Sequence, residues 1–135
     1  MPELHQAVLL YYFHSADGAP LQGNWISFSE LPHGKFYNQA FQGYTGGELV
    51  RKLGNNQQGF ERAARALHGE PSGFGSSSFA FQVLPRVPLL VVFWQGDDEF
   101  APSFQLLFDA SASHYLPTDG YAILGSNLVH KLTNQ

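Results

Sequence analysis

The residues best suited to chemistry in this sequence lie in and beside one acidic turn. Asp97, Asp98 and Glu99 directly follow a long apolar run, and Asp109 ends the next apolar run. Oxygen-rich loops bind Ca²⁺ or Mg²⁺, and neighbouring carboxylates raise one another's pKa, which is how acid–base pairs arise. The same residues suit a solvated hairpin turn, in which Gly96 and Asp97 would supply a positive φ. We favour the turn and keep Asp97, Glu99 and Asp109 as the candidate acidic site.

His114 is the histidine that best complements these carboxylates, because it follows Asp109 closely. An imidazole there could act as a general acid–base or as an axial ligand, although a surface or capping role is the simpler interpretation. The six histidines form no His-x-x-x-His or Glu-x-x-His pattern, so their spacing predicts no metal site. A catalytic role would require Asp97, Glu99, Asp109 and His114 to converge beside Trp94. Whether the chain is an enzyme stays open, and the sequence identifies no cofactor.

Three aromatic residues, Trp25, Trp94 and Tyr115, are the candidates for ligand binding. Aromatic rings with polar tips line many pockets and interfaces. In a chain with 12 Phe and 6 Tyr, however, such rings also fill the core. We expect Trp94 to be a core residue and leave both alternatives open for Trp25.

The elements that must position these residues form an α+β pattern. Residues 89–94 are continuously apolar and rich in β-branched side chains, which predicts a central strand covered on both faces. Apolar residues at helical spacing predict four helical regions. The first two cover residues 3–14 and 36–53, and the second is interrupted near Gly43, Gly46 and Gly47. The third runs from a cap at Asn55 or Asn56 to Leu67, and the fourth covers residues 119–132 with Thr118 as its cap. Further strands are expected near 25–29, 78–84 and 104–108, and a flexible loop over 70–77.

Segregated helices and hairpin-linked strands favour a small, mostly antiparallel sheet with about four helices packed against it. A length of 135 residues, 44% of them hydrophobic, suits a single α+β domain over residues 1–135.

Composition narrows the classes of partner. The formal net charge is −4 and the seven Lys and Arg residues are scattered, so nucleic-acid binding is not expected. No apolar run has the length of a membrane span, the start does not read as a signal peptide, and the absence of cysteine suits the cytoplasm. Charged residues make up only 13% of the chain. A surface so poor in charge predicts a homo-oligomer or a protein partner, with a polar monomeric surface as the alternative.

The order of several motifs carries a family resemblance over nearly the whole chain. The motifs are Gly23 and Trp25 before Phe28, Glu30-Leu31-Pro32 and Gly34, Tyr37 and Phe41, Leu84-Pro85-Arg86-Val87-Pro88, Trp94, Gly96-Asp97, Glu99-Phe100, Phe108-Asp109 and Tyr115-Leu116-Pro117-Thr118. With these motifs the chain resembles the domain-of-unknown-function family 3786 of bacterial and archaeal proteins. Two features differ from the family: Thr118-Asp119-Gly120 replaces its Thr-Glu-Asp, and the chain is expected to lack the family's N-terminal part.

The resemblance implies an association rather than a reaction. Some family members carry a separate iron–sulfur domain, which links the family to metallocofactor or one-carbon metabolism. We therefore expect an uncharacterised binding or accessory module, as a subunit or partner of such a protein. The alternatives are a small enzyme or divalent-metal-binding domain that uses Asp97, Glu99, Asp109 and His114, and a scaffold subunit whose exposed edge strand, near 25–29 or 79–83, is completed by another chain.

Overall fold

The computed structural model describes residues 23–134, so the helix predicted over residues 3–14 lies outside the described residues. Five strands form one antiparallel sheet in the order β1-β5-β4-β3-β2, which confirms the predicted α+β class. The strands are β1 (Trp25–Ser27), β2 (Glu70–Ser72), β3 (Ser77–Leu84), β4 (Val87–Trp94) and β5 (Ser103–Asp109). The helices are α2 (Gly34–Tyr44), α3 (Gly46–Leu53), α4 (Gln57–Ala66) and α5 (Thr118–Thr133), with 3₁₀ turns η1 (Phe28–Glu30) and η2 (Ala112–His114).

Strand β4 is the middle strand of the sheet, as its continuous apolar sequence predicts. It pairs with β3 on one side and with β5 on the other. Alternate side chains of a strand point to opposite faces, and Leu89 to Phe93 are buried on both faces. The hairpin that joins β3 to β4 turns within two residues, Pro85 and Arg86, with Arg86 at a φ of 57°.

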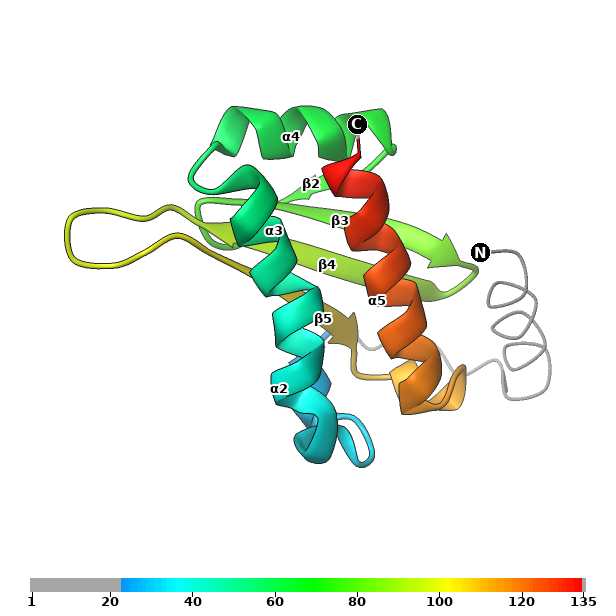
Figure 1. Cartoon of the computed structure of the whole chain (residues 1–135). Coiled ribbons are helices and arrows are strands. Elements are labelled where there is room, and N and C mark those ends of the chain that lie inside the picture. The colour runs from blue at the N-terminus through cyan, green and yellow to red at the C-terminus, as the bar shows by residue number, and fades with distance from the viewer. Residues whose placement is uncertain (1–22, 135) are drawn as a thin grey trace.

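The helices cover one face of this sheet. In Figure 1, α2, α3 and α5 lie across the near face, and α4 lies toward the side of β2 and β3. Two groups of rings fill the space between helices and sheet. Phe60 of α4 contacts Phe79, Phe93 and Phe104 with centroids 5.2–6.1 Å apart. The second group, under α2 and α5, comprises Phe28, Phe41, Phe108 and Tyr121.

One predicted strand boundary and one predicted loop are wrong. The strand expected over residues 25–29 ends at Ser27, because Phe28–Glu30 turn into η1, where Phe28 stacks on Phe41 with centroids 4.0 Å apart. The loop expected over residues 70–77 begins with strand β2, which pairs with β3. Pro71 cannot donate a backbone hydrogen bond, and for this reason its presence argues against a strand in the sequence. Strand β2 is at the edge of the sheet, where a missing donor is tolerated.

The helix boundaries are mostly those that the sequence predicts. The helical region over residues 36–53 is interrupted, but at Thr45 rather than at a glycine. Asn56 caps α4 through a bond from the Gly59 N–H. Gly69 follows the end of α4, while His68 takes the left-handed conformation at a φ of 64°. Thr118 does not cap α5; its hydroxyl donates to the Pro32 carbonyl oxygen instead.

Among the described helices, none has the length and apolar character that a bilayer span requires.

Candidate functional site

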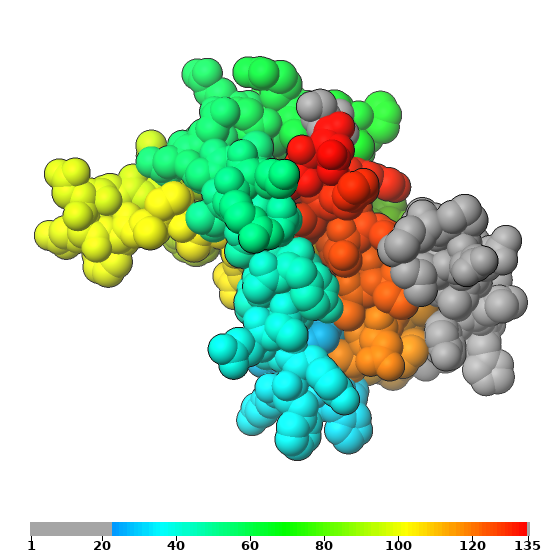
Figure 2. All heavy atoms as spheres, in the orientation of Figure 1, coloured from blue at the N-terminus to red at the C-terminus, as the bar shows by residue number. Residues whose placement is uncertain are grey.

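The most prominent surface feature is the connection between β4 and β5. Residues 95–102 project well beyond the sheet as an extended hairpin, drawn in yellow in Figure 1 and standing clear of the body of the molecule in Figure 2. This segment contains Asp97, Asp98 and Glu99 of the predicted acidic site, and all three are exposed. Trp94, at the end of β4, and Phe100 flank them. We call residues 94–102 together with Phe74 the hairpin surface.

The carboxylate of Asp97 organises the tip of the hairpin. Its Oδ1 accepts the Glu99 N–H at 2.8 Å and the Phe100 N–H at 2.9 Å, while its own N–H donates to the Phe100 carbonyl. The bonds from Phe100 and Glu99 hold the pKa of Asp97 below its ordinary value. The predicted positive φ at Gly96 is wrong; a Cβ there would lie 2.5 Å from the Pro102 nitrogen, so the close return of the chain requires glycine.

The base of the hairpin is tied to the rest of the domain by hydrogen bonds. Asn55, between α3 and α4, pairs with Gly96 through both side-chain atoms: Oδ1 accepts the Gly96 N–H at 2.8 Å, and Nδ2 donates to the Gly96 carbonyl at 3.2 Å. From the other side, the Gln95 N–H donates to the Ser76 hydroxyl at 2.8 Å. The hairpin therefore leaves the sheet in a fixed direction.

Large aromatic side chains are exposed along the hairpin, Trp94 at its base and Phe100 near its tip, and on Phe74 in the turn beside the base. The exposed fraction is 49% for Trp94, 70% for Phe100 and 47% for Phe74. The prediction that Trp94 belongs to the core is wrong: its side chain lies on the face of β4 opposite Phe93 and the helices, and it is the exposed last residue of the strand. The turn after Phe74 lies against this strand end: a Cβ on Gly75 would be 3.4 Å from Trp94 Cδ2 and 2.6 Å from Val92 Cγ1.

The other end of β5 holds Asp109, in different surroundings. Its side chain is buried, and Oδ1 accepts the Gly23 N–H at 2.9 Å. Its Oδ2 accepts the Ser111 N–H at 2.9 Å and the Ser111 hydroxyl. Trp25, a half-buried residue of β1, pairs with Asp109 in the sheet register. This carboxylate joins the start of the described chain to the turn after β5.

The structure separates the four candidate catalytic residues into two groups. Asp97 and Glu99 precede β5, whereas Asp109 and His114 lie at or after its end. Seven residues of strand span roughly 20 Å, so the two groups share no site. His114 is exposed at the end of η2. Within residues 23–134, no group of three or more His, Asp or Glu residues is arranged to hold a metal ion.

The other candidate aromatic, Tyr115, is buried and belongs to the core cluster. Trp25 is half-buried on β1, so neither it nor Tyr115 is placed with Trp94 at the hairpin. Trp25, Trp94 and Tyr115, the three aromatic residues predicted to bind a ligand, therefore do not lie at one site. Trp94 is the member with substantial exposed surface.

Local contacts and burial shift the pKa values of two further side chains, Glu61 and Tyr44. Hydrogen bonds from Ser77, at 2.7 Å, and from Gln57 lower the pKa of Glu61, and the charge of Arg65 adds to this effect. This contact ties α4 to the start of β3. Burial raises the pKa of Tyr44, and the charge of Asp119 raises it further.

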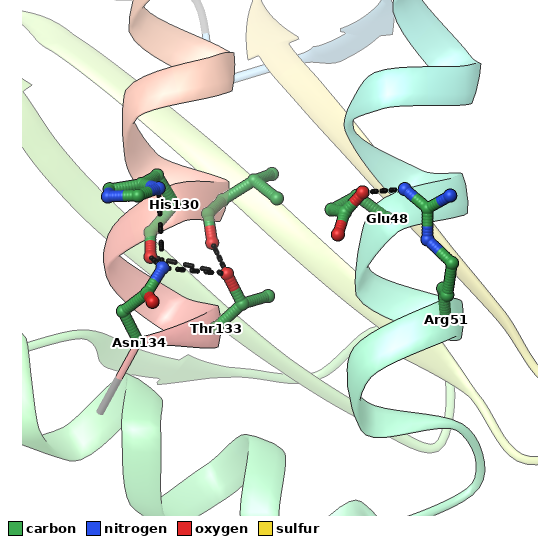
Figure 3. Close-up of polar contacts among 6 residues, drawn as sticks. Glu48, Arg51, His130, Thr133 and Asn134 are labelled. Carbon is green, nitrogen blue, oxygen red and sulfur yellow. Dashed lines mark hydrogen bonds and ion pairs between the residues drawn. The ribbon is translucent and has the colours of Figure 1, made fainter.

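A groove of about 380 Å³ between α3 and α5 contains several polar side chains. Figure 3 shows that their contacts stay within each helix. Glu48 and Arg51 pair along α3. Near the end of α5, Asn134 Nδ2 donates to the His130 carbonyl at 2.7 Å and Thr133 donates to the Val129 carbonyl at 3.0 Å. These bonds satisfy carbonyl groups that the helix end would leave unpaired, so they are structural.

Sequence reasoning missed three residues that shape the hairpin surface. Phe100 was visible as an apolar residue inside an acidic turn, which is an unusual place for a large side chain. The position of Asn55 before a helix suggests a cap, and nothing local indicates its bond to a segment 41 positions away. Phe74 lies in a stretch of Gly and Ser that resembles a linker.

The fold and this surface define a small α+β domain that presents an ordered, aromatic and acidic hairpin. The chain belongs to the family described as a domain of unknown function, DUF3786, whose family model matches residues 2–131. The match begins at residue 2, so it gives no support to the expectation that the family's N-terminal part is missing. Comparisons with curated proteins and with solved structures give no match.

Proposed function

We propose that this domain is a non-catalytic binding module that docks a partner protein through the hairpin surface. The observation that carries the proposal is the exposure of Trp94, Phe100 and Phe74 around one ordered projection. Aromatic side chains such as Trp and Phe are enriched at protein interfaces, and a few such residues carry much of the binding energy. Isolated apolar residues occur on every protein surface, but three large rings around one projection are less common.

The order of the hairpin supports the same conclusion. Bonds from Asn55 and to Ser76 hold its base, and Asp97 holds its tip. A segment that is already fixed loses little conformational entropy when a partner binds, so more of its contact energy appears as affinity.

Charge favours a different protein over a second copy of this chain. The tip carries three carboxylates, Asp97, Asp98 and Glu99, and the chain has a formal net charge of −4. Two such tips at a two-fold interface would repel each other, whereas a partner with basic residues beside an apolar groove would be attracted. The partner we infer therefore combines an apolar pocket for Trp94 or Phe100 with a positively charged rim.

The family association adds a class for this partner, namely a protein of metallocofactor or one-carbon metabolism. This chain has no cysteine, so an iron–sulfur cluster in the complex would belong to the partner. Iron analysis of a natively purified complex, beside the isolated chain, tests this assignment. Iron in the isolated chain, or none in the complex, would remove it.

The alternative of a small enzyme or divalent-metal site would have to bring Asp97 and Glu99 together with Asp109 and His114. The length of β5 separates these residues, so the geometry favours the binding module.

The test compares full-length wild-type chain with a Trp94→Ala, Phe100→Ala double variant. A partner that copurifies in stoichiometric amount is purified separately, and its affinity for both chains is measured by calorimetry at low and high salt. We expect the double variant to bind about 30-fold more weakly or worse, because a hot-spot residue contributes about 2 kcal/mol or more. Salt should weaken binding by the wild type, since the carboxylates lie at the rim.

The matched control is Phe36→Ala, which removes a ring that is 84% exposed on α2, away from the hairpin. This variant should bind as the wild type does. Equal affinity of the double variant and the wild type would overturn the proposal. A dimer in light scattering that the double variant abolishes would assign the surface to a second copy instead of a different protein.

A further inference from the structure

The outer side of α2 carries three exposed aromatic rings. The exposed fraction is 84% for Phe36, 59% for Tyr37 and 43% for Tyr44. Figure 2 shows α2 in cyan at the front of the near face, apart from the yellow hairpin. These rings and two small exposed residues between them form what we call the α2 surface, which comprises Phe36, Tyr37, Ala40, Gly43 and Tyr44. It shares no residue with the hairpin surface.

The residues of the α2 surface lie on one side of the helix. Phe36, Ala40 and Gly43 recur at spacings of four and three residues, so they follow one another along the helix. Tyr37 and Tyr44 are about two turns apart and border this row on one side. The surface therefore has a large ring at one end and a shallow centre, where the side chains are small.

Gly43 is a glycine that a single copy of the chain does not require. Its φ is not positive, and a Cβ at this position would meet nothing within 4 Å. Glycine makes a helix less stable than alanine does, because it loses more backbone freedom on folding. Close approach of another molecule is one of the uses that justify this loss. An occupant that reaches the α2 backbone beside Phe36 would explain both the exposed ring and the missing side chain.

The arrangement is complementary to a second copy of itself. Dimers of identical chains mostly have two-fold symmetry, in which the same surface of both copies meets. When two α2 helices lie antiparallel with the two-fold axis at Ala40, Phe36 of each copy lies over Gly43 of the other and beside its Tyr44. The raised ring of one copy then fills the shallow centre of the other, and the contact occurs twice.

Charge also permits contact between two copies at this surface. Helix α2 contains no Asp or Glu, and Lys35 is its one charged residue, although the whole chain has a formal net charge of −4. In the antiparallel pair the two Lys35 positions are roughly 15 Å apart along the helix axes, which exceeds the Debye length of about 8 Å. The acidic residues beside the surface lie on other helices: Glu48 of α3 is paired with Arg51, and Asp119 lies on α5.

The exposed area indicates how strong such a contact can be. Because a fully exposed aromatic residue offers about 200 Å², the three rings offer roughly 400 Å² per chain. A standard stable interface buries about 800 Å² on each partner. The rings supply about half of this area, and their neighbours on α2, such as Lys35 and Gln39, add to it. The expected complex is therefore a weak dimer.

We propose that two copies of this chain form a two-fold dimer through antiparallel contact of their α2 surfaces. This inference is independent of the proposed docking function, because the two surfaces have no residue in common. Sedimentation equilibrium of the full chain from about 1 μM to 1 mM tests it. We expect a monomer at the lowest concentration and a dimer at the highest, with a Kd of about 100 μM. A monomer at every concentration, or association that continues beyond a dimer, rules the proposal out.

Two variants locate the contact. Phe36→Ala should weaken dimerisation at least tenfold, because each dimer loses two rings. Gly43→Ala should weaken it about tenfold, because a methyl group then occupies the space for the ring, and should raise the unfolding temperature of the monomer at about 1 μM. These opposite effects separate the lost contact from damage to the fold.

Gly73→Ala is the matched control for the glycine variant, because a Cβ there also meets nothing within 4 Å but lies in the turn after β2. It should dimerise as the wild type does, and so should the Trp94→Ala, Phe100→Ala double variant. Unchanged dimerisation in both α2 variants refutes the proposal. Loss of the dimer in the double variant assigns self-association to the hairpin surface instead.

A single cysteine tests the antiparallel arrangement, because the natural chain contains none. Ala40→Cys places the two sulfur atoms opposite each other at the two-fold axis, so oxidation with glutathione disulfide should give a linked dimer. Phe36→Ala in the same chain should reduce the yield, and Gln58→Cys, at an exposed position of α4, should give little. A dimer in the centrifuge that the Ala40→Cys chain does not link contradicts this arrangement.

Discussion

The turn before β5 and the turn after it each contain an aspartate in the same local motif, but the two aspartates stabilise different parts of the molecule. Asp97 and Asp109 each accept the backbone N–H of the residue two positions later. Asp97 is exposed, and its partners all lie within the hairpin. Asp109 is buried, and it also binds the Gly23 N–H, 86 positions away. The local turn chemistry is thus shared, whereas burial and the distance along the chain decide what each carboxylate stabilises.

Because of this difference, the turn at Asp109 stabilises the whole domain, whereas the turn at Asp97 shapes only the exposed hairpin. At the Asp109 end, loss of the carboxylate would leave buried donors without acceptors. At the Asp97 end, water can replace each bond, so the energetic consequence is local. Four substitutions, in order of decreasing expected effect on stability, test this contrast.

The largest effect is expected for Asp109→Ala. The change removes the acceptor for the Gly23 N–H, the Ser111 N–H and the Ser111 hydroxyl. We expect the free energy of unfolding to fall by roughly 3 kcal/mol, because the two Ser111 donors are buried and each unsatisfied buried group costs about 1–3 kcal/mol. Urea denaturation followed by circular dichroism measures the change. Asp109→Asn keeps one acceptor oxygen and should lose less; a loss below about 1 kcal/mol in the alanine variant would contradict the structural role.

Gly46→Ala tests the packing of α3 on the hairpin end of β5. A Cβ on Gly46 would lie 2.4 Å from the Phe104 carbonyl oxygen, a backbone atom that cannot move aside without disturbing the strand. We expect a loss of about 2 kcal/mol, which is typical of overpacking. Gly43→Ala in α2 is the matched control, since its Cβ meets nothing within 4 Å. It should instead stabilise the protein by about 0.5–1 kcal/mol, and similar losses in both variants would refute the steric explanation.

Asn55→Ala removes both hydrogen bonds to Gly96. We expect a loss of about 1 kcal/mol in the free energy of unfolding, because these bonds are exposed to water. The more specific result is faster amide exchange of Gly96, measured by NMR. Asn55→Asp retains the acceptor for the Gly96 N–H and should show an intermediate rate. Equal exchange in all three proteins would mean that the hairpin base is held in another way.

The smallest global effect is expected for Asp97→Ala, which should leave the unfolding midpoint nearly unchanged and alter the Glu99 and Phe100 amide signals. The same signals report a pH effect. Because hydrogen bonds lower the pKa of folded Asp97 beneath its ordinary value of 3.8, its contribution is complete above that pH and is lost as pH falls through the lower folded value. NMR titration of the wild type should show both amides shifting only in this acidic range. Amide shifts near neutral pH would contradict this assignment.

The sequence was sufficient where the pattern is local. The apolar run at 89–94 predicted the middle strand, because a strand covered on both faces needs apolar side chains at every position and the run is short and rich in β-branched residues. Helical periodicity and the Asn56 cap placed α3 and α4 within a few residues, and the preferred interpretation of the acidic segment, a solvated hairpin turn, agrees with the bonds of Asp97.

Other features required the tertiary structure. Strand β2 is a strand because β3 supplies its hydrogen bonds, although Pro71 and its neighbours have low strand propensity. Trp94 lies on the face of β4 opposite Phe93 and the helices and is exposed there, and sequence alone does not give which face the helices cover. The roles of Asp97 and Asp109 differ for the same reason, since the motif in each case is an aspartate followed by a turn.

The sequence by itself determined the α+β class, the central strand, the position of the acidic turn and the family, because each depends on neighbouring residues or on motif order. The tertiary structure decided which aspartate is buried and which aromatic rings, on the hairpin and on α2, face water. Burial is a property of what packs above a residue, and that neighbour is often distant in the chain. Local pattern therefore specifies the elements, and only their packing specifies the surfaces available for binding.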